Sequence, residues 1–191
     1  ALIWRRVAET LKPKSTESIK LKVDGETTSE ELKVANSFND FFMNKVKQLS
    51  EKIDPALKEN PLSRLAEKIH GKNLSFKLKP VSEKEVVKAI RNLKPKKSCG
   101  HDDMSQELLK SVSSILTLPL KSIINLSIKS GVFPNAWKHS KVIPIHKKGG
   151  IDDVVNYRPV SVLPAASKVL ESVILQQITT YFEKHHLLPD G

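Results

Sequence analysis

Apolar residues recur at three- and four-residue steps after residue 28, and this spacing predicts a helix with one apolar face. Thr28 followed three residues later by Glu31 is a capping-box pattern, so the helix is predicted to begin there. Its predicted apolar stripe consists of Leu32, Ala35, Phe38, Phe42, Val46, Leu49 and Ile53. Upstream, the pattern predicts a short helix over residues 4–11 and either a small hairpin or an irregular loop around Asp24-Gly25.

The second part of the chain carries further helix signals. A capping box of Ser82 and Glu85 predicts a helix that Pro95 ends. Ser105 is predicted to cap the next helix, and Pro119 to restart a helix that closes at Gly131. The inward residues predicted for the Ser105 helix are Leu108, Leu109, Val112, Ile115 and Leu116. A long amphipathic helix is predicted from about residue 169 to His185.

Two β-prone runs interrupt the helices, at residues 142–145 and 160–163. We expect two antiparallel strands joined by a long basic loop. Pro144 and Pro159 favour edge positions or strand starts. The predicted fold class is therefore α+β and mostly α-helical.

Prolines and glycines cluster between the two helical parts. Pro55, Pro61, Gly71 and Pro80 punctuate a weakly patterned connector with a short predicted helix over residues 62–69. We place a domain boundary near Pro80, which gives a helical extension at 1–80 and a second domain at 81–191.

Charge narrows the class of partner. The 191 residues contain 32 Lys and Arg against 21 Asp and Glu, a net charge of +11 that favours a polyanionic partner, nucleic acid first. Anionic membrane is the other polyanion, but no apolar run is long enough to predict a span. The single cysteine, Cys99, fits a reducing compartment, so an intracellular location is expected. The amino end has neither an initiator Met nor a signal peptide, and is expected to be internal to a longer product.

Several motifs occur in a characteristic order in the second part. They are Lys97–Met104, Gly131–Lys138 (Gly-x-x-Pro-x-x-Trp-Lys), Lys141–Gly149 (Val-x-Pro-Ile-x-Lys-Lys-Gly), Asn156–Pro164 (Asn-Tyr-Arg-Pro-Val-Ser-Val-Leu-Pro) and Lys168–Glu171. Together they resemble the reverse transcriptase of non-LTR (LINE-type) retrotransposons. Residues 1–80 match more loosely, at Asp24-Gly25 and Ala35–Phe42, and are similar to the linker that joins endonuclease to polymerase in that family.

The resemblance implies the fingers part of a right-hand polymerase, with one β-hairpin and a helical N-terminal extension. The palm aspartates that hold metal in the family would lie beyond Gly191, so the fragment is not expected to polymerise by itself. No cofactor is expected in this fragment, whereas Mg²⁺ is expected for the full-length enzyme. The implied partners are an RNA template, a DNA primer and the remaining palm and thumb, with an intracellular location in cytoplasm and nucleus.

Arg158 is the first candidate site residue, because the Tyr-Arg-Pro motif of the family carries the fingers arginine that contacts incoming nucleotide phosphates. Its forked guanidinium suits bidentate phosphate recognition. An ion pair that holds the hairpin is the alternative. The other candidates for triphosphate or template contact are Lys141, Lys147 and Lys148, and those for template backbone are Lys96 and Lys97, with plain solvation as the alternative for each.

No catalytic residue and no metal ligand is predicted in this chain. The acidic pairs Asp102-Asp103 and Asp152-Asp153 are expected to cap helices or solvate turns. Gly100 is expected to permit a special backbone turn. Trp137 is expected in a core, with base stacking as the alternative.

Two apolar surfaces are predicted to contact other parts of a polymerase. Phe38 and Phe42 form a packing face that would dock on the polymerase, and Val169, Val173 and Ile174 are expected to pack against the missing palm. A non-enzymatic RNA-binding or adaptor protein derived from such an element, or a non-functional remnant, remains the alternative function.

Overall fold

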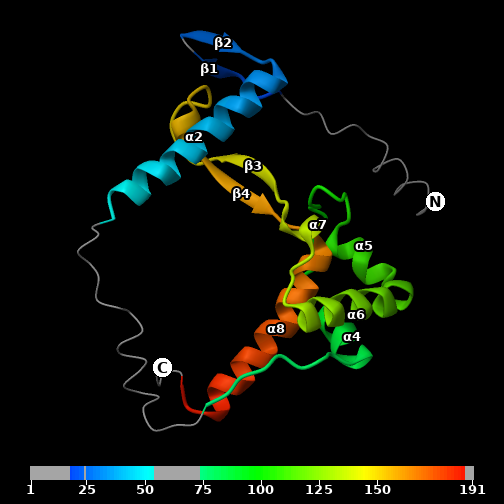
Figure 1. Ribbon diagram of the computed structural model, residues 1–191. Helices are drawn as coiled ribbons and strands as arrows, with labels where there is room; N and C mark the ends of the chain where they lie inside the picture. The colour runs from blue at the N-terminus through cyan, green and yellow to red at the C-terminus, as the bar shows by residue number, and fades with distance from the viewer. Residues whose placement is uncertain (1–17, 24, 54–73, 188–191) are drawn as a thin grey trace, which may run out of the picture. The chain divides into compact units, whose positions relative to one another are not determined.

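The computed structural model describes residues 18–23, 25–53 and 74–187 (Figure 1). The helices predicted over residues 4–11 and 62–69 lie outside the described residues. The chain forms two compact units: unit 1 comprises Ala1–Ala56 and Pro144–Pro159, and unit 2 comprises Leu57–Ile143 and Val160–Gly191. The predicted boundary near Pro80 stays a prediction.

Unit 1 begins with a two-stranded hairpin. Strands β1 (Leu21–Val23) and β2 (Glu26–Thr28) pair antiparallel, with Leu21 opposite Thr28. Gly25 in the connecting turn has a φ of 88°, a left-handed conformation that glycine adopts without strain. Of the two alternatives for this segment, the hairpin is correct, and it adds a second hairpin to the single one expected.

Helix α2 (Glu31–Glu51) follows the hairpin, but the predicted capping box at its start is wrong. Thr28 belongs to β2, and its Oγ1 accepts a hydrogen bond from the Glu30 amide at 3.2 Å. Glu30 is the N-cap and its side chain makes no capping bond. The pairing of β2 therefore takes Thr28 away from the position that the local pattern assigned to it.

A small core closes unit 1. Its buried members are Leu21, Val34 and Phe38, with Phe42, Val154 and Tyr157 among the half-buried residues packed against them. The predicted apolar stripe is thus correct at Phe38 and Phe42 and wrong at the other five positions, which are all exposed: Leu32, Ala35, Val46 and Leu49 on α2, and Ile53 beyond its end. Only the first half of the helix packs within the unit.

Unit 2 is a cluster of helices (Figure 1). These are α4 (Glu83–Asn92), α5 (Gln106–Ser111), α6 (Ser113–Ser130), α7 (Asn135–Lys138) and α8 (Ala165–Lys184). The predicted capping box is confirmed at α4, where Ser82 and Glu85 bond reciprocally, and Ser105 caps α5 through the Leu108 amide at 3.0 Å. Gly131 ends α6 with a φ of 69°, as predicted.

The predicted restart at Pro119 is wrong, because α6 begins at Ser113 and Pro119 lies inside it. A proline there leaves the carbonyl of Ile115 without its usual amide donor. Pro119 and Ile115 are both exposed, so water can replace that donor. Exposure of this turn explains how the helix continues through the proline.

The core of unit 2 lies among α4, α5, α6 and α8. Ile90, Leu109 and Ile124 are fully buried in it, whereas Leu108 and Ile115 are exposed, contrary to the inward positions predicted for them. Val169 and Val173 on α8 are also buried in this core, and Ile174 packs against it. The expectation that this face of α8 would need a missing palm to cover it is therefore wrong: the chain's own helices cover it.

Side chains fix the segment before α4 and the end of α4. The amide of Asn125 on α6 accepts from the Val81 N–H at 2.7 Å and donates to the Val81 carbonyl at 3.0 Å. The Lys110 ammonium donates to the carbonyls of Arg91 at 2.7 Å and Leu93 at 2.8 Å, where α4 ends and its carbonyls lack partners.

Strands β3 (Lys141–His146) and β4 (Tyr157–Val162) pair as the predicted second sheet, with a short 3-10 helix η1 (Val154–Asn156) before β4. The mostly helical α+β class is confirmed, with two small antiparallel sheets. Every helix in the described ranges is too short or too polar to cross a lipid bilayer.

Candidate nucleic-acid interface

The β3–β4 hairpin carries three of the predicted cations, Lys147 and Lys148 in its loop and Arg158 in β4, and all three are exposed. The Lys147 amide donates to the Asn156 carbonyl at 2.7 Å, so these two positions face each other at the end of the hairpin. The Asn156 side chain closes the loop by donating to the Gly150 carbonyl at 2.9 Å. Lys147 therefore lies opposite Asn156, and Arg158 follows two residues later, in β4. Backbone pairing, rather than a contact between side chains, brings the two cations near each other.

Tyr157 packs one face of this hairpin against α2. Its ring lies edge-on to Phe38 with centroids 4.9 Å apart, and 5.3 Å from the ring of His146 on the opposite strand. Its hydroxyl donates to the Ile151 carbonyl at 2.7 Å, and desolvation together with nearby Asp152 raises the pKa of Tyr157. Since successive side chains of a strand point to opposite faces, Arg158 projects away from the face that Tyr157 packs against α2.

The acids of the loop are engaged locally. Asp152 forms an ion pair with Lys22 at 2.7 Å, and the hydrogen bond from Lys22 lowers the pKa of Asp152. Asp153 accepts from the Val155 amide at 3.0 Å, as expected of a residue that caps a turn. Both acids thus stabilise the loop and are turned to partners other than the predicted cations.

None of the six predicted cations takes part in an ion pair within the part of the chain that the structure describes. For Arg158, the alternative of an ion pair that holds the hairpin is therefore not seen among those residues. Arg158, Lys147 and Lys148 belong to unit 1, whereas Lys141, at the start of β3, belongs to unit 2.

Lys96 and Lys97 lie in unit 2, in the turn between α4 and α5, and both side chains are exposed. The turn is anchored by its backbone: the Glu107 amide donates to the Lys96 carbonyl at 3.3 Å. The backbone of Lys96 is therefore held at the start of α5, within unit 2.

Gly100, in the same turn, is required for a reason that the sequence did not predict. It has no left-handed backbone conformation, but a Cβ atom there would lie 2.9 Å from the nitrogen of Pro164 and 3.1 Å from the carbonyl carbon of Leu163. Backbone atoms cannot move aside as a side-chain tip can. Gly100 thus permits close approach of the turn to the start of α8 rather than a special turn.

Two other expectations for this region are resolved. Ser105 caps α5, as predicted, so of the two roles expected for Asp102 the helix cap is not seen, and its carboxylate instead accepts from the Met104 amide of the turn at 3.3 Å. Trp137 is half-buried and packs on the core of unit 2, with the Phe133 ring 6.4 Å away, as the core alternative predicted. Within residues 18–23, 25–53 and 74–187, no three His, Cys, Asp or Glu side chains gather as metal ligands.

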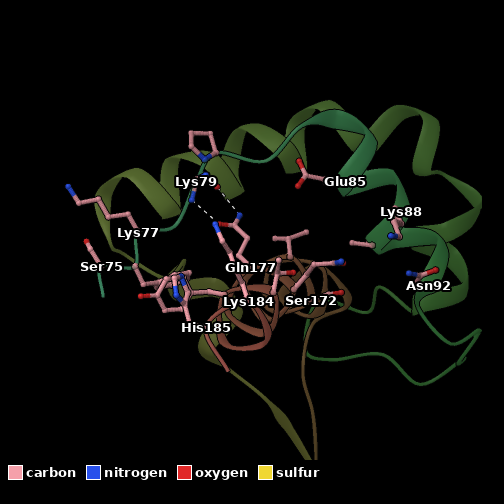
Figure 2. A pocket seen from close by; sticks show the side chains of 17 residues that line it. Ser75, Lys77, Lys79, Glu85, Lys88, Asn92, Ser172, Gln177, Lys184 and His185 are labelled. Atoms are coloured by element: carbon pink, nitrogen blue, oxygen red, sulfur yellow. Dashed lines mark hydrogen bonds between the residues drawn. The ribbon is translucent and has the colours of Figure 1, made fainter. Parts of the chain in front are cut away.

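Sequence patterns missed one further group of cations. Lys77, Lys79, Lys88 and Lys184 surround a groove in unit 2 and come from three separate segments of the chain (Figure 2). Lys79 and Gln177, which join two of these segments, are 98 residues apart, so no local signal could have found the groove.

No protein-family model matches this chain. A probable RNA-directed DNA polymerase from transposon BS of Drosophila melanogaster is 33% identical over 118 residues, which are 61% of this chain and 13% of that protein. The RNA-directed DNA polymerase from mobile element jockey of Drosophila melanogaster is 35% identical over 108 residues, and that of Drosophila funebris 36% over 111 residues. These matches cover 56% and 58% of this chain and 12% of each jockey protein, so the chain spans only a small part of its relatives. The resemblance read from the motifs is confirmed: the chain is similar in sequence to a segment of the RNA-directed DNA polymerases of non-LTR retrotransposons.

Proposed function

We propose that this chain is a segment of an RNA-directed DNA polymerase and that it contacts the template and the phosphates of the incoming nucleotide. The observation that carries the proposal is the β3–β4 hairpin, where Lys147 and Lys148 of the loop and Arg158 of β4 are exposed, while Asp152 and Asp153 contact other partners. The similarity to RNA-directed DNA polymerases supports the choice of nucleic acid and nucleotide as partners.

Arg158 is the central residue of this proposal. A guanidinium presents donors in a planar fork, which matches two oxygens of one phosphate and retains its charge at any physiological pH. Lys147, close in register across the hairpin, adds a second positive charge beside the same phosphate path. Tyr157 acts through packing: its contact with Phe38 fixes the strand that carries Arg158.

The metal chemistry of polymerisation is assigned to residues outside this segment. Two-metal catalysis needs carboxylates free to share divalent cations. The paired acids do not fit, because among the described residues no three His, Cys, Asp or Glu side chains gather, and Asp152 is in an ion pair with Lys22 while Asp102 and Asp153 accept hydrogen bonds from turn amides. In this proposal the segment supplies positive charge, orientation and template contact, and Mg²⁺ is held by other parts of the polymerase.

Nucleotide binding by the polymerase that contains this segment tests the proposal. Arg158→Lys keeps the charge and loses the fork, and Arg158→Ala loses both. We expect the KM for deoxynucleotide to rise in both variants, more in Arg158→Ala, by roughly one to two orders of magnitude for a lost charged hydrogen bond. Lys129→Ala, at an exposed position near the end of α6, is the matched control and should behave as the wild type.

Binding of the chain itself separates this proposal from its alternative. An adaptor that binds RNA by charge alone would lose the same affinity in Arg158→Ala and in Lys148→Ala, because each variant removes one positive charge. Neither variant would then change the use of nucleotide. A polymerase whose KM for nucleotide is unchanged in Arg158→Ala would refute the assignment of Arg158. Absence of salt-sensitive RNA binding by the chain would refute the template contact.

A further inference from the structure

Unit 2 contains a groove whose lining includes none of the β3–β4 loop residues. It has a volume of about 820 Å³ and is lined by the second half of α8, one side of α4 and the segment Ser75–Pro80 (Figure 2). Lys88 and Asn92 of α4 lie at one end, near Ser172, and Lys77 and His185 lie at the other end.

The walls of the groove are fixed by hydrogen bonds and ring contacts. The Gln177 side chain on α8 accepts from the Lys79 amide at 2.8 Å and donates to the Lys79 carbonyl at 2.9 Å, as the dashed lines in Figure 2 show. Phe76 packs on Tyr181 with centroids 5.0 Å apart, and Tyr181 lies 4.5 Å from His185. The groove is thus a built feature in which an extended segment is clamped onto α8.

Positive charge dominates the lining. The lining contains four lysines and one acidic residue, Glu85. The lysines are Lys77, Lys79, Lys88 and Lys184. The Glu85 carboxylate already accepts hydrogen bonds from the Ser82 amide and hydroxyl, both at 2.7 Å. In the described part of the chain, none of the four lysines is in an ion pair. The lining therefore carries more positive than negative charge, with four lysines and one carboxylate.

The length of the groove favours a polymer over a small anion. Ser172 and Lys184 are twelve residues apart on α8, or about 18 Å along the axis at 1.5 Å per residue. Lysines stand near both ends, so one phosphate group or one nucleotide would meet only part of them. A chain of phosphates would meet both ends.

The aromatic end of the groove favours nucleic acid over an acidic polypeptide. Phe76 is 39% exposed and Tyr181 is half-buried beside it, so part of this aromatic pair is accessible to solvent at the end of the groove that also carries Lys77. Rings beside lysines are the combination that binds single-stranded nucleic acid, with bases on the rings and phosphates on the cations.

We propose that this groove binds single-stranded nucleic acid, with backbone phosphates along Lys77, Lys184 and Lys88 and a base against Phe76. The site uses none of the residues assigned to the β3–β4 loop, so it goes beyond the proposed function and does not depend on Arg158.

Charge reversal in the groove tests the proposal. Lys77→Glu combined with Lys88→Glu should weaken binding of a fluorescent short oligouridine to the chain, measured by anisotropy. The slope of log affinity against log salt should fall by about 1.4, at about 0.7 for each lost phosphate contact on a single strand. The matched control reverses Lys47 and Lys129, which are exposed outside the groove and give the same change in net charge.

A second variant tests the base contact. Phe76→Leu should weaken oligouridine binding at least fivefold, since stacking on an aromatic ring contributes about that much or more per base. Binding of inorganic polyphosphate, which has no bases, should be unchanged. Arg158→Ala should not change photocrosslinking of oligouridine to Phe76 or Tyr181. Failure of the groove proposal can therefore be distinguished from failure of the proposal for Arg158.

Crosslinking keeps the test valid if a variant fails to fold. Oligouridine carrying a photoreactive thio-base should crosslink the unaltered chain at peptides that contain Phe76 or Tyr181, located by mass spectrometry. The proposal is overturned if crosslinks avoid both residues, if the groove variant binds as well as the matched control, or if polyglutamate displaces the oligonucleotide as efficiently as unlabelled oligouridine does.

Discussion

Substitution of Phe38 by alanine should detach the β3–β4 loop from the N-terminal hairpin and helix. Phe38 is 5% exposed, and its ring meets the rings of Phe42 at 5.8 Å and Tyr157 at 4.9 Å. Truncation of a buried phenylalanine to alanine costs about 3–5 kcal/mol. We expect about 3 kcal/mol, the lower end, because the core of unit 1 has three buried members among the residues that the structure describes, and a core of this size can relax.

Hydrogen exchange of one amide reports this directly. The Lys22 amide in β1 donates to the Asp152 carbonyl of the loop at 2.8 Å, so it is protected only while hairpin and loop stay together. A loss of about 3 kcal/mol corresponds to a shift of roughly 140-fold in that equilibrium. The peptide that contains Lys22 should therefore exchange faster in Phe38→Ala by up to that factor.

Leu32→Ala is the matched control on the same helix, since Leu32 is 67% exposed and contributes little to the core. It should leave exchange at Lys22 close to that of the unaltered chain. The reasoning is refuted if Phe38→Ala leaves the Lys22 amide protected, or if Leu32→Ala exposes it to the same degree.

Three other perturbations give distinct outcomes. Gly100→Ala should lower the free energy of unfolding of unit 2 by about 1–3 kcal/mol in urea titrations, because its Cβ meets the backbone at Leu163–Pro164; an unchanged midpoint would contradict this. Lys110→Met should lower the same free energy by about 1–3 kcal/mol, because two carbonyls at the end of α4 lose a charged donor; equal stability would show that water replaces it. Hydrogen bonds from Ser82 lower the pKa of Glu85 below 4.5, so the capping box stabilises the fold above that pH and is lost as pH falls through the lower, folded-state value. Glu85→Gln should reduce this acid-dependent loss of stability, and identical pH profiles would exclude the carboxylate as its source.

The sequence by itself determined the features that are completed within a few residues. The capping box of Ser82 and Glu85 and the stop at Gly131 are formed by neighbours in the chain, so their physical chemistry is local, whereas at Gly25 the sequence indicated a turn but left hairpin and irregular loop open. The motifs between residues 97 and 171 also sufficed to indicate the similarity to retrotransposon polymerases, because their order along the chain is itself a sequence property.

Tertiary structure decided which faces are buried and which groups meet. A helical stripe shows that a face is apolar but does not show how far along it a partner extends, so Leu32 and Val46 were assigned wrongly while Phe38 was correct. Val169 and Val173 were expected to pack against a palm outside this chain, but α4, α5 and α6 of the same chain bury them. The close approach at Gly100 and the two hydrogen bonds between the Gln177 side chain and the Lys79 backbone join segments far apart in sequence. Such contacts exist only after the chain has folded, because the pairing of distant segments depends on the packing of the whole unit.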